Sequence, residues 1–414
     1  MAKLWKDTFH DSDQYVSLVF SNYFNPDLVE FEENDGEVVA AMLGVPYRFG
    51  NASNSIKALY LCGLATKPQF RSRGIMTRLL AKMNDKARNA GFAFTFLIPS
   101  DPGLRKYYRD RGFVNAFYRV IDNYTSLHDF NLEFNAILAE QKEKVAVLKK
   151  RYFDSLKCSV INSSTPVDTQ TISSLVALIR SIEDNQQDLQ IIHSDRDIEI
   201  LIRENALSGG SIVYSYNSSD QITAVAFVTV SDAEANIHKL FSTDLASKYK
   251  VMSAVKEKFA DLPIRHYVSS IEMDRNAVWA RSYGSFMGET MAVGTISVTE
   301  RVYSLAAHAK VYGMAHILDL YEILKFQAGN RHDLKYSILM KSSDVYTLEQ
   351  IDTLNGEVKV RKLPVDSVDS AKMAYLMSKR DISEILFRRR DTDNMITEAF
   401  GIPSINGAIN LMLD

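Results

Sequence analysis

The chain has 414 residues, a length that predicts roughly two to three domains. Apolar residues make up 46%, charged residues 24% and aromatic residues 10%, which excludes a disordered, collagenous or disulfide-stapled protein. The 48 Lys and Arg residues nearly balance the 51 Asp and Glu residues, for a formal charge of −3. This balance argues against a chain built mainly to neutralise nucleic-acid phosphates.

The first segment of the chain alternates helix and strand signals. Capping residues precede an apolar helical pattern at 16–23, and two apolar runs flank the turn-rich GNASNS, which predicts strands at 37–48 and 57–66. The basic loop KPQFRSRG then leads into a long helix that ends at Gly91. Its apolar face comprises Ile75, Met76, Leu79, Leu80, Met83 and Ala87. The segment closes with a buried strand (FAFTFLI), a short helix at 102–111 and another strand (FVNAFYRV).

A second segment follows a polar connector and begins near residue 165. An amphipathic helix comes first, and Ser194 with Asp197 forms a predicted capping box for the next helix. SIVYSY and QITAVAFVTV flank NSSD as a predicted hairpin, followed by a strand (NIHKLF), a helix and a strand (IRHYV). This order echoes the first segment, although no sequence repeat supports a duplication. A third, α+β segment begins near residue 290, with strands near 314–320, 336–341 and 356–363 and helices near 368–378 and 382–390.

The two cysteines and the apolar segments bear on the compartment. Cys62 and Cys158 lie far apart, the first inside an apolar run, which indicates a reducing environment. The N-terminus has no apolar core of a signal peptide, and no apolar stretch approaches the roughly 20 residues that span a bilayer. We therefore expect a cytoplasmic protein without a membrane partner.

The strongest motif is LCGLATKPQFRSRGIMTRLL at 61–80, in which a strand runs through a basic loop directly into a helix. The first turn of a helix has unpaired N–H groups and the positive end of the helix dipole, so it suits a pyrophosphate. Arg71 and Arg73 add charge for the same anion. A solvated loop is the simpler reading of a basic helix start alone. The preceding strand, the long helix and the downstream Y-x-x-x-G-F together favour a binding site.

These elements resemble a known family. R-S-R-G-I-M at 71–76 is similar to the acetyl-CoA loop of the GNAT-superfamily N-acetyltransferases, and Y-R-D-R-G-F at 108–113 is similar to their Y-x-x-x-G-F. The whole-chain architecture, with MAHILDLYEIL at 314–324, resembles the Eis-like (enhanced intracellular survival) branch. The resemblance implies a mixed α+β and α/β fold in three domains. These are a catalytic GNAT domain at 1–125, a degenerate GNAT-like domain at 126–288 and a sterol-carrier-protein-like domain at 289–414.

The resemblance implies an N-acetyltransferase that uses acetyl-CoA as co-substrate and a primary amine as acceptor, with direct attack of the amine on the thioester. The implied coenzyme contacts are Leu64, Ala65, Thr66, Arg71, Ser72, Arg73, Gly74, Ile75, Met76, Thr77 and Ser100. The backbone of 64–66 would pair with the pantetheine arm and supply the oxyanion donor. Two features depart from the pattern. Met76 stands where many GNAT proteins have Gly or Ala, and SDPGLRKYY is long, which leaves the match at Ser100 open.

Tyr108 is the candidate general acid for the departing thiolate. Its reference pKa is near 10 and that of a thiol near 8.5, so the proton transfer is uphill by roughly 2 kcal/mol. A core aromatic with a satisfied hydroxyl is the structural alternative. Tyr107 is a rival, but the spacing to Gly112 and Phe113 favours Tyr108.

The candidate base is Asp414. Many GNAT enzymes place a Glu on the strand before the loop, but ALYLCGLAT has no Asp, Glu or His. In the Eis-like branch the C-terminal carboxylate folds into the active site, and the matching residue here is Asp414. Either its terminal carboxylate, with a reference pKa near 3.5, or its side chain could accept the proton. A frayed terminus is the alternative, although AINLML argues for burial.

The histidines do not form metal-ligand spacing with one another or with a cysteine, so we expect no metal. RRR at 388–390 reads as a solvated helix end, and we expect no nucleic-acid partner. The expected partner is a small-molecule or peptide amine, and a homo-oligomer is possible from the family. Two alternatives stay open. One is a longer-chain N-acyltransferase like the N-myristoyltransferases, and the other is a non-enzymatic protein that binds coenzyme or lipid.

Overall fold

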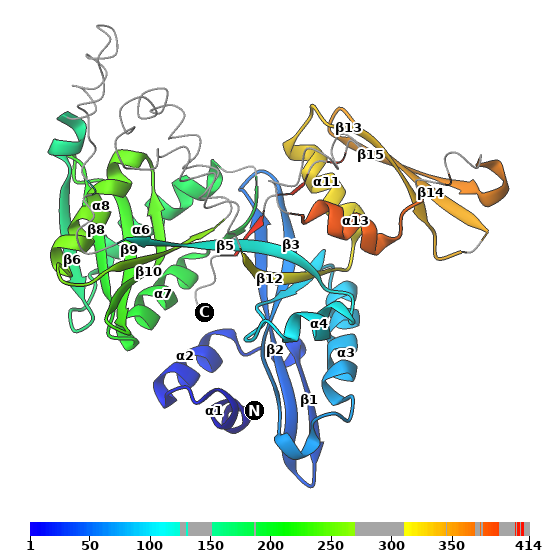
Figure 1. The fold of residues 1–414 in the computed structure, drawn as a ribbon, viewed down its shortest axis with the longest axis horizontal. Helices are drawn as coiled ribbons and strands as arrows, with labels where there is room; N and C mark the ends of the chain where they lie inside the picture. The colour runs from blue at the N-terminus through cyan, green and yellow to red at the C-terminus, as the bar shows by residue number, and fades with distance from the viewer. Residues whose placement is uncertain are drawn as a thin grey trace, which may run out of the picture. The chain divides into compact units, whose positions relative to one another are not determined.

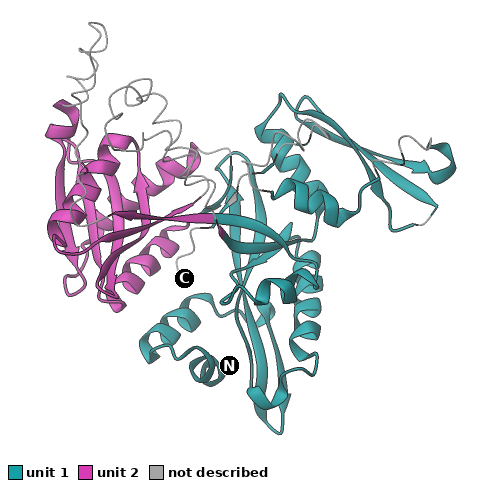
Figure 2. Ribbon diagram, viewed as in Figure 1, with its two compact units in different colours: residues 1–118, 187–192, 311–409 teal, residues 119–186, 193–310, 410–414 magenta. Residues whose placement is uncertain are grey.

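The computed structural model describes residues 1–124, 130, 151–185, 188–269, 310–344, 346–368, 373, 376–388, 402, 404–405 and 407–409. The chain divides into two compact units (Figure 2). Unit 1 takes its residues from 1–118, 187–192 and 311–409, and unit 2 from 119–186, 193–310 and 410–414. Helices and both parallel and antiparallel strand pairs occur, so the mixed α and β fold class predicted from the sequence is confirmed. The three predicted domain ranges stay a prediction.

The N-terminal part of unit 1 follows the predicted order. Its elements are α1 (Ala2–Phe9), α2 (Asp13–Tyr23), β1 (Val29–Asn34), β2 (Glu37–Gly50), β3 (Ser55–Thr66), α3 (Ile75–Asn89), β4 (Phe94–Leu97), α4 (Leu104–Arg109) and β5 (Val114–Tyr124, leaving the unit after Tyr118) (Figure 1). Local signals set the boundaries. Ser12 caps α2 because its hydroxyl accepts a hydrogen bond from the Tyr15 N–H at 3.1 Å.

Residues from later in the chain complete unit 1. These are β7 (Leu189–Ile192), β12 (Lys310–Ile317, entering the unit at Val311), α11 (Leu320–Asn330), β13 (Lys335–Lys341), β14 (Thr347–Leu354), β15 (Glu357–Pro364), α13 (Lys379–Leu386) and β16 (Gly407–Ala408). The strand order is β16-β7-β2-β3-β4-β12, with β1 on β2, and β13-β14-β15 form a separate antiparallel sheet. β12 pairs antiparallel with β4, and the Phe387 ring packs 6.3 Å from that of Phe94. A segment near residue 315 thus becomes part of the N-terminal sheet.

Three details of the third predicted segment were wrong. The strand predicted at 314–320 ends at Ile317, because Asp319 caps α11 by accepting hydrogen bonds from the Tyr321 and Glu322 N–H groups. β14 was missed, although it pairs along its length with both neighbours. Most of the helix predicted at 368–378 lies outside the described residues, but Met377 near its end forms an isolated parallel bridge to Met340. In each case tertiary pairing or a cap overrides the apolar pattern.

The core of unit 1 surrounds α3. The apolar face of this helix packs on residues of β2 and β3, and Tyr108, Phe113 and Met314 belong to the same cluster. The predicted helix face is largely confirmed, since Ile75, Leu79, Leu80, Met83 and Ala87 are buried and Met76 is partly buried. α4 and the loop after β3 therefore pack against a shared core.

From α6 onwards, the elements of unit 2 follow the order of those in the first 100 residues. The unit contains β6 (Lys157–Asn162), α6 (Thr169–Asp184), α7 (Asp195–Leu207), β8 (Ser211–Tyr216), β9 (Ile222–Ser231), β10 (Glu234–Ser242), α8 (Leu245–Lys258) and β11 (Ile264–Ser269). β10 pairs in parallel with β11 across α8, as β3 pairs in parallel with β4 across α3. One difference bears on binding. The N-cap of α8 is Asp244, whose carboxylate accepts the Ser247 N–H at 2.9 Å.

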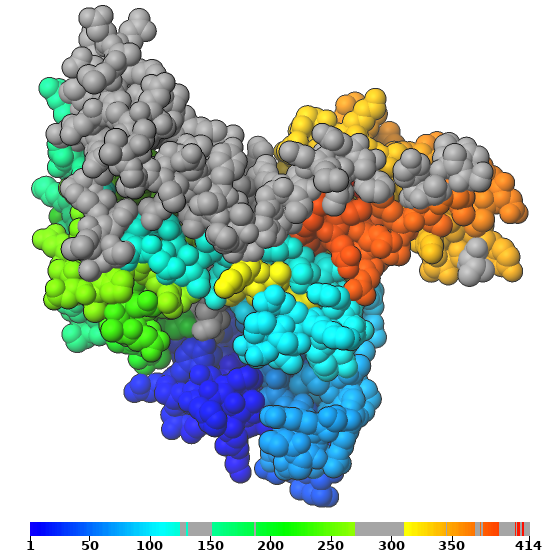
Figure 3. Space-filling model, viewed as in Figure 1, coloured from blue at the N-terminus to red at the C-terminus, as the bar shows by residue number. Residues whose placement is uncertain are grey.

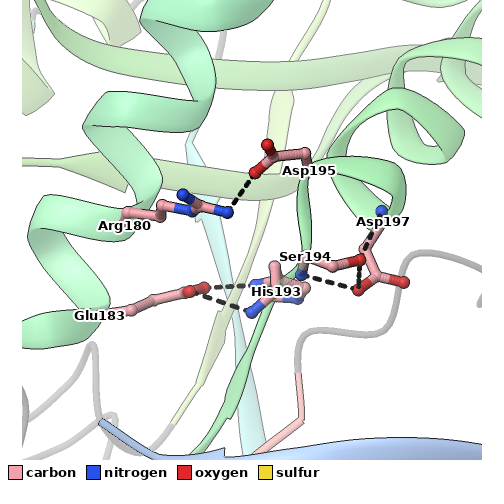
Figure 4. Close-up of polar contacts among 6 residues, drawn as sticks. All are labelled: Arg180, Glu183, His193, Ser194, Asp195 and Asp197. Carbon is pink, nitrogen blue, oxygen red and sulfur yellow. Dashed lines mark hydrogen bonds and ion pairs between the residues drawn. The ribbon is translucent and has the colours of Figure 1, made fainter. Parts of the chain in front are cut away.

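The start of α7 is fixed by polar contacts (Figure 4). Ser194 and Asp197 form the predicted capping box, which is confirmed. The Glu183 carboxylate accepts the backbone N–H of His193 at 3.0 Å and also contacts the His193 ring, and both side chains are buried. These bonds hold the end of α6 against the start of α7. Within the described residues, no helix is both long and apolar enough to cross a membrane.

Candidate functional site

The loop between β3 and α3 presents backbone amides that have no partner among the described residues. Gly74 is the N-cap of α3, with φ +73°, and no side chain caps the helix. In the described part of the chain, the N–H groups from Ser72 through Thr77 donate no hydrogen bond, and the first intrahelical bond runs from the Arg78 N–H to the Gly74 carbonyl at 3.1 Å. No acidic residue lies in the first turn. A row of free amides at the positive end of a helix dipole is an anion-binding arrangement.

Two arginines place positive charge beside these amides. The Arg71 Nε donates to the Thr66 carbonyl at 3.0 Å, and the Arg73 guanidinium lies 5.0 Å from the centroid of the Phe70 ring. Neither makes an ion pair with a described residue, whereas Arg78 pairs with Glu32 at 2.9 Å. The two arginines named in the sequence motif therefore keep their charge available to an anion at the start of α3.

β3 offers a free edge beside the loop. It pairs with β4 only through Ala58, Leu59 and Tyr60, and its other edge pairs with β2 as far as Thr66. The ladder between β2 and β3 shifts register between Ala41 and Leu43, where Gly63 and Leu64 bulge. Beyond Tyr60, the β4-facing edge of β3 therefore has no strand partner among the described residues. Unpaired backbone groups at 61–66 can hydrogen-bond an extended ligand as another strand would.

Tyr108 lies in the core cluster that also contacts Leu64, Ile75 and Met76. Its side chain is 8% exposed, and its ring packs edge-on against Tyr107 and Phe113, with centroids 5.3 and 5.8 Å away. The hydroxyl makes no hydrogen bond with a described residue. Burial raises the pKa of Tyr108 to about 12, with Tyr107 adding to the rise and Arg111 opposing it. Tyr108 is thus a neutral donor without an acceptor among the described residues, unlike the satisfied core tyrosine of the alternative reading.

Arg111 is a residue of this site that the sequence analysis missed. Its Nε and Nη2 donate to the Thr77 hydroxyl at 2.9 and 2.7 Å, and its Nη1 donates to the Tyr107 carbonyl at 2.7 Å. The guanidinium also stacks over the Tyr107 ring, 3.4 Å from its centroid. In Figure 3, atoms of the α4 region lie against those of α3 on the face of the molecule that is drawn. The only sequence signal for the contact between Arg111 and Tyr107 is their spacing of four residues.

The Arg111 contacts change the reading of Thr77. Its hydroxyl is already engaged by Arg111 and lies 3.5 Å from the Tyr107 hydroxyl, so it joins the start of α3 to α4. Only its backbone N–H remains among the free amides. Ser100 is exposed in the turn after β4. Asp414 lies outside the described residues.

Replacing Arg111 with Ala should destabilise the link between α3 and α4. The change removes charged donors from a half-buried hydroxyl and a carbonyl, so we expect the free energy of unfolding to fall by about 1–3 kcal/mol. Urea unfolding measures the change. Arg109→Ala is the matched control, because Arg109 is exposed at the end of α4, two residues before Arg111, and makes no ion pair with a described residue. Equal losses in the two variants would contradict the role of Arg111.

A metal site or a reactive thiol would place specific requirements on the described residues. They contain no group of three or more His, Cys, Asp and Glu side chains placed to hold a metal ion. Burial raises the pKa of the Cys62 thiol to about 12 and that of Cys158 to about 11. Neither thiol is therefore an activated nucleophile near neutral pH.

Comparisons with known proteins agree with this geometry. Residues 1–116 match the family described as Acetyltransferase (GNAT) domain. None of the curated proteins compared with the chain matches it. Among solved structures, a conserved protein from Enterococcus faecalis V583 described as a probable N-acyltransferase has a TM-score of 0.61 at 11% identity, covering 96% of this chain and 88% of that chain.

Two further structures have the same fold over nearly the whole chain. A GCN5-related N-acetyltransferase from Kribbella flavida has a TM-score of 0.61 at 11% identity, covering 96% of this chain and 87% of that one. Eis1 from Mycobacterium abscessus has a TM-score of 0.57 at 8% identity, covering 96% and 88%. At these identities the likeness establishes the fold alone. The family match is confined to residues 1–116, so the similarity to the Acetyltransferase (GNAT) domain concerns the first part of the chain.

Proposed function

We propose that this protein is an N-acetyltransferase that transfers the acetyl group of acetyl-CoA to a primary amine. The observation that carries the proposal is the row of unpaired amides from Ser72 through Thr77 at an uncapped helix start. Residues of β3, with Tyr108, whose hydroxyl has no hydrogen-bond partner among the described residues, belong to the same core cluster as that helix. Acetyl-CoA would supply a pyrophosphate for the amides and an activated acetyl thioester.

The backbone holds and orients the co-substrate in this proposal. The amides of the 72–77 loop, with Arg71 and Arg73, bind the pyrophosphate. The edge of β3 at Leu64, Ala65 and Thr66 hydrogen-bonds the extended arm, and one N–H there stabilises negative charge on the acyl oxygen. Holding the acyl carbon beside the amine supplies much of the rate. Because both cysteines keep their protons at neutral pH, direct transfer is favoured over an acyl-cysteine route.

Tyr108 is the proposed general acid that faces the departing sulfur in this scheme. With a pKa near 12 against about 8.5 for a thiol, complete transfer is uphill by roughly 5 kcal/mol, more than the sequence alone predicts. Tyr108 is therefore expected to donate a hydrogen bond that strengthens as the C–S bond breaks. The proposed base is the carboxylate of Asp414, which rests on the sequence resemblance.

The test is a turnover assay of the purified chain with acetyl-CoA and a panel of amines, which follows release of free thiol. Release that depends on an amine, with acetylated amine found by mass spectrometry, supports the proposal. Binding of coenzyme A without turnover of any amine would favour the non-enzymatic alternative. Preference for palmitoyl-CoA over acetyl-CoA in direct competition would favour the longer-chain alternative.

A further inference from the structure

Trp5, on α1, packs directly on the bulge of β3. Gly63, at the bulge, has φ +61°, a conformation that side chains other than glycine rarely adopt. A Cβ at Gly63 would lie 2.1 Å from Cζ3 and 2.5 Å from Cε3 of the Trp5 indole. The ring thus fills the space of any side chain at position 63. Both the backbone conformation and this neighbour require glycine at the bulge.

The indole is held in this position by its surroundings. Its Nε1 donates to the Asp11 carboxylate at 2.7 Å, and its ring meets Phe9 and Phe20 edge-on, with centroids 5.3 and 5.7 Å away. Leu4, next to it on α1, is buried in a cluster with Ala41 and Ala65. Trp5 itself is 9% exposed. A rigid aromatic ring, oriented by a hydrogen bond, therefore presses on the strand immediately before Leu64–Thr66.

The bulge sets the direction of the backbone that follows it. Across the register shift, two residues of β3, Gly63 and Leu64, face one residue of β2. Such a bulge changes the direction of the backbone N–H and C=O groups of Leu64 and Ala65. We propose that Trp5 is a positioning residue for acyl-CoA: it clamps the bulge of β3 so that the free edge of the strand faces the thioester arm. This inference rests on the proposed function and adds a residue that does not itself touch the co-substrate.

The first experiment uses the indole as a reporter. The chain has two tryptophans, Trp5 and Trp279, so a Trp279→Phe variant leaves Trp5 as the sole indole. Titration of this variant with coenzyme A should change its fluorescence, with the same midpoint that calorimetry finds. If calorimetry detects binding while the Trp5 emission stays constant, the proposed coupling between Trp5 and the binding strand is wrong.

The second experiment separates positioning from simple packing. In Trp5→Ala, we expect kcat/KM for acetyl-CoA to fall by roughly 100-fold, the scale seen when reacting groups are displaced by about 1 Å. Trp5→Phe keeps a flat ring on Gly63 and should recover much of that loss. Val16→Ala is the control: it removes buried atoms from α2, and should lower the unfolding temperature without changing the affinity for coenzyme A.

The outcomes distinguish this inference from the proposed function. If the wild-type chain fails to bind coenzyme A, the proposed function fails, and this inference with it. If the wild type binds and turns over acetyl-CoA, and folded Trp5→Ala has unchanged affinity and kcat/KM, only the role of Trp5 is overturned. Should Trp5→Ala not fold, the comparison of Trp5→Phe with wild type and the fluorescence titration decide the question.

Discussion

Replacing Tyr108 with Phe should lower kcat by roughly 100-fold or more, the usual range for loss of a general acid, with little change in the affinity for coenzyme A. The ring is buried against Tyr107 and Phe113, and Phe fills the same space, so the fold should be preserved. The hydroxyl makes no hydrogen bond with a described residue, so its removal strands no partner. Steady-state kinetics and calorimetry with coenzyme A together measure the two effects.

Tyr107→Phe is the matched control for this prediction. The Tyr107 hydroxyl lies 3.5 Å from the Thr77 hydroxyl and is therefore already engaged by the protein, unlike that of Tyr108. Its loss should alter kcat only slightly. A larger loss of kcat in Tyr107→Phe than in Tyr108→Phe would reverse the assignment. Unchanged kcat in both variants would remove tyrosine acid catalysis from the mechanism.

The pH profile provides a second check on Tyr108. Burial raises its pKa to about 12, so the folded protein keeps this proton throughout the range from pH 7 to 10. The acid form is therefore fully present there and is lost only as the pH rises through about 12. We expect no alkaline fall in kcat from Tyr108 below pH 10. If an alkaline fall below pH 10 in the wild type disappears in Tyr108→Phe, the tyrosine titrates lower than its burial implies.

The elements of the first segment could be predicted because their signals are local. Ser12 caps the helix that follows it, and the apolar spacing from Ile75 to Ala87 lies within one helix. The pairing of β12 with β4 joins Met314 to Leu97, over 200 residues apart in sequence, and no local pattern encodes it. The same limit explains why a strand near 315 was assigned to a separate third segment.

The site shows the same division between local and non-local information. The free amides near Gly74 follow from a loop–helix junction that is legible in the sequence. The Arg111 contact with Thr77 and the Trp5 contact with Gly63 cannot be read there, because each joins two elements in space. A motif thus predicts the groups that could bind a ligand, whereas the residues that hold them in place emerge only from the packing.

Replacing Gly74 with Asp should weaken the binding of coenzyme A by roughly 100-fold relative to Gly74→Asn. Both side chains tolerate positive φ better than most, and a Cβ at Gly74 would meet only Arg78, at 3.8 Å. The two variants therefore share a similar steric cost and differ by one negative charge. Two unit charges about 4 Å apart repel by about 4 kcal/mol at an effective dielectric constant of 20, which is enough for this loss.

A helix with an acidic N-cap already occurs in unit 2 of the same chain. Asp244 is the N-cap of α8, and its carboxylate already accepts the Ser247 N–H, so the amides there have an internal anion. Gly74→Asp would give α3 the acidic start that α8 has, and should keep the helix intact while closing it to a pyrophosphate. Calorimetry at low and high salt measures the effect, and the gap between Asp and Asn should narrow as salt screens the repulsion. Equal affinities in the two variants would mean that the pyrophosphate binds elsewhere, because a charge placed at the start of α3 must be felt by an anion bound there.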